Sequence, residues 1–114
     1  MAVKNKKSKG YAVSYDSLCS ILRNPKVANG LEAKLMNEVT MPDGIEFQFV
    51  KAPIEVKLSS AYGRNYFVKL QRINDNNTNV TVATQSRKPT VLLDTLWLNE
   101  VNKVFLIIDT LITD

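Results

Sequence analysis

The sequence contains no histidine among its 114 residues. Histidine is the commonest general base and a usual zinc ligand, so its absence excludes Ser-His-Asp and Cys-His catalysis and the usual zinc sites. The four glycines stand apart, and none belongs to a glycine-rich phosphate-binding loop. Glu46 and Glu55 are better explained as a solvated strand face than as a catalytic pair. We therefore predict a protein that is not an enzyme and that has no metal or cofactor.

Cysteine occurs once, at Cys19. A single cysteine forms no intrachain disulfide, so a reducing compartment, the cytoplasm, is the simpler expectation. The flanking residues favour a helix in which Cys19 is a small buried hydrophobic residue rather than a reactive thiol. No apolar run of signal-peptide length follows residues 1–10, and polar residues interrupt the apolar C-terminal segment. We expect neither a secretion signal nor a membrane span.

The formal net charge of +4 is distributed unevenly. Residues 1–10 contribute +4, residues 11–44 contribute −1, residues 45–90 contribute +4 and residues 91–114 contribute −3. Such basic segments attract polyanions, including nucleic acids. We expect residues 1–10 to be a disordered basic tail and residues 11–114 to fold as a single domain.

The hydrophobic pattern predicts helices first and strands afterwards. Ser14 can cap a helix that ends at Arg23, and Pro25 suits the start of a second helix that continues to Val39. From residue 45 the apolar period is two, which predicts four strands near 45–49, 54–58, 66–71 and 80–83. Short loops between these strands favour an antiparallel meander.

The C-terminal segment predicts a long helix that begins after Thr90 and has a broad apolar face. Residues 104–108 are rich in β-forming side chains, so a strand stays open as the alternative there. The predicted fold class is therefore α+β, with two N-terminal helices, a four-stranded antiparallel meander and a long C-terminal helix.

The outward face of the predicted sheet carries basic side chains around an aromatic ring. Phe67 and Lys69 alternate with apolar residues on one strand, and Lys57 lies on the strand before. Cations bind phosphates and an aromatic ring stacks on bases of any sequence, so this face fits single-stranded DNA or RNA. The predicted nucleic-acid-binding residues are Lys57, Arg64, Phe67, Lys69, Arg72, Arg87 and Lys88. Edge-strand lysines that prevent aggregation, and a Phe67 that packs under a helix or in an interface, are the structural alternative.

The closing helix presents more apolar surface than one sheet face readily covers, so we also predict a homo-oligomer, a dimer or larger. Trp97 and Phe105 are candidate anchors of either the core or the oligomer interface. The alternative function is accordingly a homo-oligomeric structural or protein-interaction module. A small phage or mobile-element protein, such as a virion component or an inhibitor of a host enzyme, fits that description.

Four strands with basic character followed by one long helix is the predicted element order of residues 45–112. This order resembles the transcription-coactivator PC4 and Whirly group. The resemblance implies single-stranded DNA binding by the sheet and oligomerisation through the closing helix. It rests on element order alone, so no site residue is carried over from it.

Overall fold

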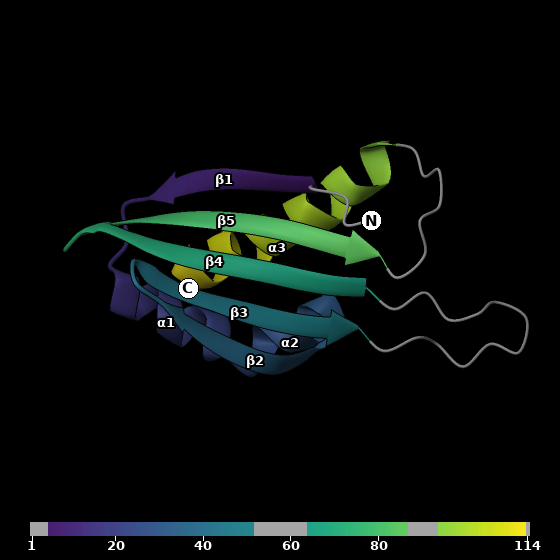
Figure 1. Ribbon diagram of the computed structural model, residues 1–114, viewed down its shortest axis with the longest axis horizontal. Helices are drawn as coiled ribbons and strands as arrows, with labels where there is room; N and C mark the ends of the chain where they lie inside the picture. The colour runs from purple at the N-terminus through teal and green to yellow at the C-terminus, as the bar shows by residue number, and fades with distance from the viewer. Residues whose placement is uncertain (1–4, 52–63, 87–93, 114) are drawn as a thin grey trace, which may run out of the picture.

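The computed structural model describes residues 5–51, 64–86 and 94–113, which form a five-stranded antiparallel sheet with three helices on one face (Figure 1). The strands are β1 (Asn5–Tyr11), β2 (Lys34–Met41), β3 (Gly44–Lys51), β4 (Arg64–Asn74) and β5 (Asn77–Ser86). The helices are α1 (Tyr15–Arg23), α2 (Pro25–Leu31) and α3 (Asp94–Thr113). The strand order is β1-β5-β4-β3-β2, so β4 is the middle strand and β1 and β2 are the edges.

The fold class is α+β with an antiparallel sheet, but the predicted number and order of elements were wrong. Residues 5–10, part of the expected disordered tail 1–10, form strand β1 together with Tyr11, and β1 pairs with β5 along its whole length. A strand therefore precedes the two N-terminal helices, and the sheet has five strands rather than four. Lysines are frequent on edge strands, where they discourage pairing with other chains. The lysines of β1 therefore gave an edge strand the composition of a disordered tail. The predicted strand at 54–58 lies outside the described residues.

Side-chain caps explain where the first two helices begin. Ser14 Oγ accepts a hydrogen bond of 3.2 Å from the Ser17 backbone N–H at the start of α1. Asn24 ends α1 and caps α2 by accepting a 2.9 Å hydrogen bond from the Lys26 backbone N–H, and Pro25 occupies the first turn.

The second helix is shorter than predicted, because it ends at Leu31 rather than at Val39. Glu32 adopts a left-handed conformation with φ of 55°, and the chain then enters β2. The spacing of four residues between Leu31, Leu35 and Val39 fits one side of a helix, but Leu35 and Val39 lie on opposite faces of β2, because the register shifts between Leu35 and Asn37. Pairing with β3 decides in favour of the strand.

One hydrophobic core fills the space between the sheet and the helices. Phe47, Phe49 and Tyr66 are fully buried on the sheet side, and Val104 and Ile108 are fully buried on α3. Residues 104–108 therefore lie in a helix, and the strand alternative was wrong.

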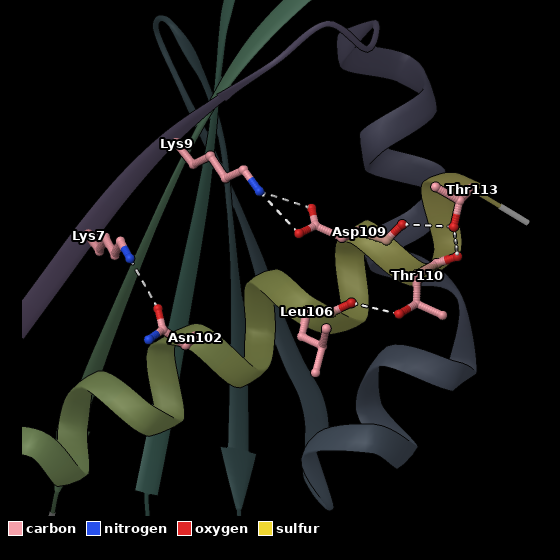
Figure 2. Close-up of polar contacts among 7 residues, drawn as sticks. All are labelled: Lys7, Lys9, Asn102, Leu106, Asp109, Thr110 and Thr113. Carbon is pink, nitrogen blue, oxygen red and sulfur yellow. Dashed lines mark hydrogen bonds and ion pairs between the residues drawn. The ribbon is translucent and has the colours of Figure 1, made fainter.

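Strand β1 is anchored on α3 by polar and aromatic contacts. Lys7 Nζ donates a 3.2 Å hydrogen bond to Asn102 Oδ1, and Lys9 Nζ lies 3.0 Å from Asp109 Oδ2 (Figure 2). The Tyr11 ring stacks on Phe105 with 6.5 Å between the ring centroids. Two lysines of the predicted tail are thus directed at the helix layer and hold β1 in place.

Candidate nucleic-acid interface

One face of the sheet is covered by the helices, and none of the described elements covers the other, which we call the open face (Figure 1). The two faces are clearest on β4, where Tyr66, Val68 and Leu70 are fully buried against the helix layer. Side chains alternate along a strand, so Phe67 and Lys69 project from the open face. Both are half-buried among their neighbours, and their predicted placement on one face is confirmed.

The strand register sorts the open face into rows that cross all five strands. Residues paired across antiparallel strands share a face, so each row is read from the pairing. The central row consists of Asn37, Gln48, Phe67, Ala83 and Lys6. The row beside it consists of Val39, Glu46, Lys69, Thr81 and Ser8. Phe67 thus stands on the middle strand in the middle of its row.

Phe67 is the one aromatic side chain on the open face among the residues whose side chains the structure describes. Its cross-strand neighbours are Gln48 and Ala83, a flexible amide and a single methyl group. Neither neighbour can cover a phenyl ring as a second aromatic or a long aliphatic side chain would. The ring is therefore a flat apolar surface set within polar surroundings.

Amide and hydroxyl groups lie on the same face as this ring, on the strands to either side of β4 and on the edge strands. Asn37 Nδ2 donates to Gln48 Oε1 at 3.3 Å, and Gln48 Nε2 donates to Glu46 Oε1 at 3.0 Å. On the other side of the ring, the hydroxyls of Ser8 and Thr81 are 2.7 Å apart. These side chains include both hydrogen-bond donors and hydrogen-bond acceptors. Groups of both kinds are needed to bind the edges of a base that stacks on an aromatic ring.

The positive charge of the open face comes from Lys6, Lys34 and Lys69. Lys6 and Lys34 lie on the two edge strands and are exposed. Lys69 Nζ lies 3.7 Å from Asp43 Oδ2, in a pair whose side chains are 36% and 45% exposed. An ion pair so open to water contributes little free energy, so Lys69 can exchange its carboxylate partner for a phosphate. Glu46 is the carboxylate within the two central rows.

Arg72 does not join the other predicted binding residues. It pairs with the buried Thr78, so it projects toward the helix layer. Its guanidinium carbon lies 4.8 Å from the centroid of the Tyr15 ring, and its Nη2 lies 3.9 Å from Asp16 Oδ1. The alternation of side chains along a strand predicts the same result from the sequence, because Arg72 is even-numbered and even-numbered residues of β4 lie on the other face of the sheet from Phe67.

Of the remaining predicted residues, Phe105 is the one whose side chain the structure describes. Arg64 is the first residue of β4, but its side chain is outside the described set, and Lys57, Arg87 and Lys88 lie outside the described residues altogether. Trp97 lies in α3, and its side chain is likewise not described. Phe105 is 6% exposed and belongs to the core, the first of the two roles considered for it.

Alternation along single strands did not identify the residues that lie near Phe67 and Lys69 on the open face, which are Asn37, Gln48, Thr81, Ala83 and Lys6. Four of the five strands contribute them, and two of those strands, β1 and β2, were not predicted as strands. The cross-strand register is what brings such residues together, and alternation within one strand does not specify that register.

Comparison with known proteins gives a likeness of structure and none of sequence. No family model and no curated protein matches the sequence. Among solved structures, the fold is similar to the crystal structure of the vertebrate conserved region of human METTL16. The TM-score is 0.44 and the identity 11%, and the match covers 90% of this chain and 98% of that chain. We attach no functional meaning to this likeness, and the resemblance to the PC4 and Whirly group stays a prediction.

The described part of the chain contains neither a metal-binding cluster nor a helix that could span a membrane. There, no three histidine, cysteine, aspartate or glutamate side chains come together in a way that could hold a metal ion. Among the helices described, α3 is the longest with 20 residues, and none is long and apolar enough to cross a membrane.

Proposed function

We propose that this protein binds single-stranded nucleic acid, DNA or RNA, on the open face of its sheet. The observation that carries the proposal is the position of Phe67, a half-buried ring at the centre of an uncovered polar face. Stacking of a base on an aromatic side chain contributes about 1–3 kcal/mol and tolerates any base. A sheet with aromatic side chains on an uncovered face is also a common way to bind unpaired RNA bases.

The other groups of the open face have separate roles in this proposal. A base stacked on Phe67 presents its edge to the amide of Gln48 and to the Ser8 and Thr81 hydroxyls. Lys69 and the edge lysines Lys6 and Lys34 contact phosphates of the nucleic acid that lies across the sheet. From sequence alone, Lys57, Arg87 and Lys88 are proposed to extend this contact. Arg64 and Arg72 hold even-numbered register positions of β4, which belong to the face away from Phe67.

In this proposal the protein acts by binding and catalyses no reaction. The one cysteine supports that view, because Cys19 is 6% exposed and burial raises the pKa of its thiol, which disfavours the reactive thiolate. A free buried thiol also suits a reducing compartment, so we propose a cytoplasmic location.

A homo-oligomeric or protein-interaction module is the second candidate, and the edge strand β2 favours it. Met36 and Val39 on this strand are 57% and 40% exposed, and an edge strand with exposed apolar side chains can pair with another chain. On α3, Ile107 and Ile112 are partly buried against the core, so less apolar surface is left for a second copy than the sequence predicts, while Leu106 remains exposed. Light scattering at high protein concentration tests for the dimer or larger assembly.

Fluorescence anisotropy tests the proposed function directly. The protein is titrated into a labelled single-stranded oligonucleotide at ~50 mM salt, where the electrostatic contribution is strong, and an unlabelled competitor is then added. The proposal expects saturable, competable binding with slight dependence on base sequence. Absence of saturable binding to both DNA and RNA would leave the protein-interaction module as the function to pursue.

A further inference from the structure

A hollow of about 410 Å³ lies at one end of the sheet, apart from the open face. Its wall is formed by Tyr15 of α1, by Arg72 of β4 and by residues 40–44, which connect β2 to β3. Gly44 in this wall is required by packing, because a Cβ there would overlap the carbonyl oxygen of Leu70 on β4. The connection therefore lies tightly on β4, and the Arg72 backbone N–H donates to the Asp43 carbonyl oxygen at 3.3 Å.

The Arg72 side chain is held in position but has few hydrogen-bond partners. Its guanidinium lies over the Tyr15 ring at 4.8 Å, which restrains the plane of the group. Among the described residues its only ionic partner is Asp16, at 3.9 Å, which is beyond hydrogen-bond distance, and the Asp16 side chain is 93% exposed. The planar set of N–H donors is therefore available to an anion with two acceptor oxygens in one plane.

The hollow also contains a carboxylate, that of Asp43, which is directed toward the open face. Gln71 Nε2 donates to Asp43 Oδ2 at 2.9 Å, and Lys69 Nζ lies 3.7 Å from the same oxygen. Gln71 and Lys69 are open-face residues, whereas Arg72 projects to the other side of β4. Asp43 thus marks the boundary between the open face and the hollow, and its negative charge is partly balanced by Lys69.

We infer that the hollow at Tyr15 and Arg72 binds the terminal phosphate of a single-stranded nucleic acid whose bases lie on the open face. This inference rests on the proposed function. Phe67 and Arg72 are five residues apart on β4, a distance of roughly 16 Å, so one short oligonucleotide reaches both.

A phosphate at the end of a chain fits this hollow better than one within the chain. A terminal monoester carries about −1.5 to −2 charges near neutral pH, against one for a diester, and it has three free oxygens. A terminal phosphate therefore binds a restrained guanidinium more strongly than a diester phosphate does. Arg72 also lies just beyond the β2–β3 connection, because Gly44 at the start of β3 pairs with Gln71, so a nucleic acid that follows β4 past Phe67 and Lys69 reaches the hollow there.

The test compares three forms of one oligonucleotide, with a 5′-phosphate, with a 3′-phosphate or with both ends unphosphorylated, in competition anisotropy at ~50 mM salt. We expect one terminal phosphate to tighten binding to the wild-type protein about fivefold to tenfold. Arg72→Gln should remove this preference and leave the affinity for the unphosphorylated form nearly unchanged. Arg72→Lys keeps the charge without the planar fork, so it should retain only part of the preference. Asp43→Asn should enlarge the preference, because it removes a nearby negative charge.

Lys26→Gln is the matched control, because Lys26 is an exposed cation of α2 away from the hollow. Thermal unfolding of each variant shows that it is folded. Equal binding of all three oligonucleotides by the wild-type protein would overturn the inference and leave the proposed function intact. An equal loss of preference in Lys26→Gln, or an equal loss of affinity for all three forms in Arg72→Gln, would also overturn it. If the wild-type protein binds none of them, the proposed function fails as well.

Discussion

Phe67 on β4 lies directly opposite Ala83 on β5, so the residue paired with it on that side contributes only a methyl group. Phe67 and Ala83 are both half-buried on the open face. A larger residue at position 83 would compete with a base for the surface of the ring.

Ala83→Leu is therefore expected to weaken oligonucleotide binding while the protein stays folded. The added side chain projects into solvent beside the ring and not into the core, so the free energy of unfolding should change by less than about 0.5 kcal/mol. Anisotropy titration measures the binding, and thermal unfolding measures the stability. Unchanged affinity in Ala83→Leu would show that no base lies on that flank of Phe67.

Phe67→Ala tests the stacking platform itself. We expect a loss of about 1–3 kcal/mol in binding free energy and little change in melting temperature, because the ring lies outside the core. Phe47→Ala is the contrasting variant: Phe47 lies on the buried side of neighbouring β3 and is 0% exposed, so its loss should cost about 3–5 kcal/mol of stability. Leu106→Ala, which shortens a side chain 65% exposed on α3, should change neither quantity. A large drop in melting temperature for Phe67→Ala would instead indicate a structural role.

Local sequence was sufficient to predict the parts of the fold that local interactions determine. The cap at Ser14, the helix start at Pro25 and the alternation of Tyr66, Phe67 and Val68 follow from chemistry within a few residues. The strands β1 and β2 were missed because edge strands bury fewer side chains, so their hydrophobic period is weak and pairing with a neighbour defines them. For the same reason the sequence predicted Phe67 and Lys69 together, but not Gln48 and Ala83 beside them.

The salt dependence of binding should identify which lysines contact phosphates. For single strands, the log–log slope of affinity against salt is about −0.7 per phosphate neutralised. Lys6→Gln should make the slope less negative by about 0.7, the contribution of one phosphate, because Lys6 projects from the open face beside Ala83. Lys7→Gln makes the same charge change on the next residue, whose side chain is bonded to Asn102 of α3 instead. These point variants are preferable to removing residues 5–11, which would delete β1 from the sheet. The same change of slope for both would mean that the basic N-terminal segment attracts nucleic acid without using the face.

The Tyr11 hydroxyl predicts how stability depends on pH. Tyr11 is 7% exposed, and its hydroxyl has no hydrogen-bond partner among the described residues. Burial, and after it the nearby Asp109 carboxylate, raises the pKa of Tyr11 above its ordinary value of 10.0. The folded protein therefore holds the phenol proton more tightly than the unfolded chain does. It follows that this contribution to stability is complete below pH 10.0 and is lost as the pH rises above that value.

Tyr11→Phe isolates this effect, because it keeps the ring stacked on Phe105 and removes the ionisable group. At neutral pH the variant should be as stable as the wild type or slightly more stable, since a buried hydroxyl without a partner is unfavourable. Denaturant unfolding of both proteins on each side of pH 10.0 gives the free energies to compare. Wild-type stability should fall relative to the variant on the alkaline side, while lysines and other tyrosines affect both proteins alike. Parallel curves would mean that the Tyr11 phenol ionises as readily in the folded protein as in the unfolded chain, and that its hydroxyl is in contact with solvent.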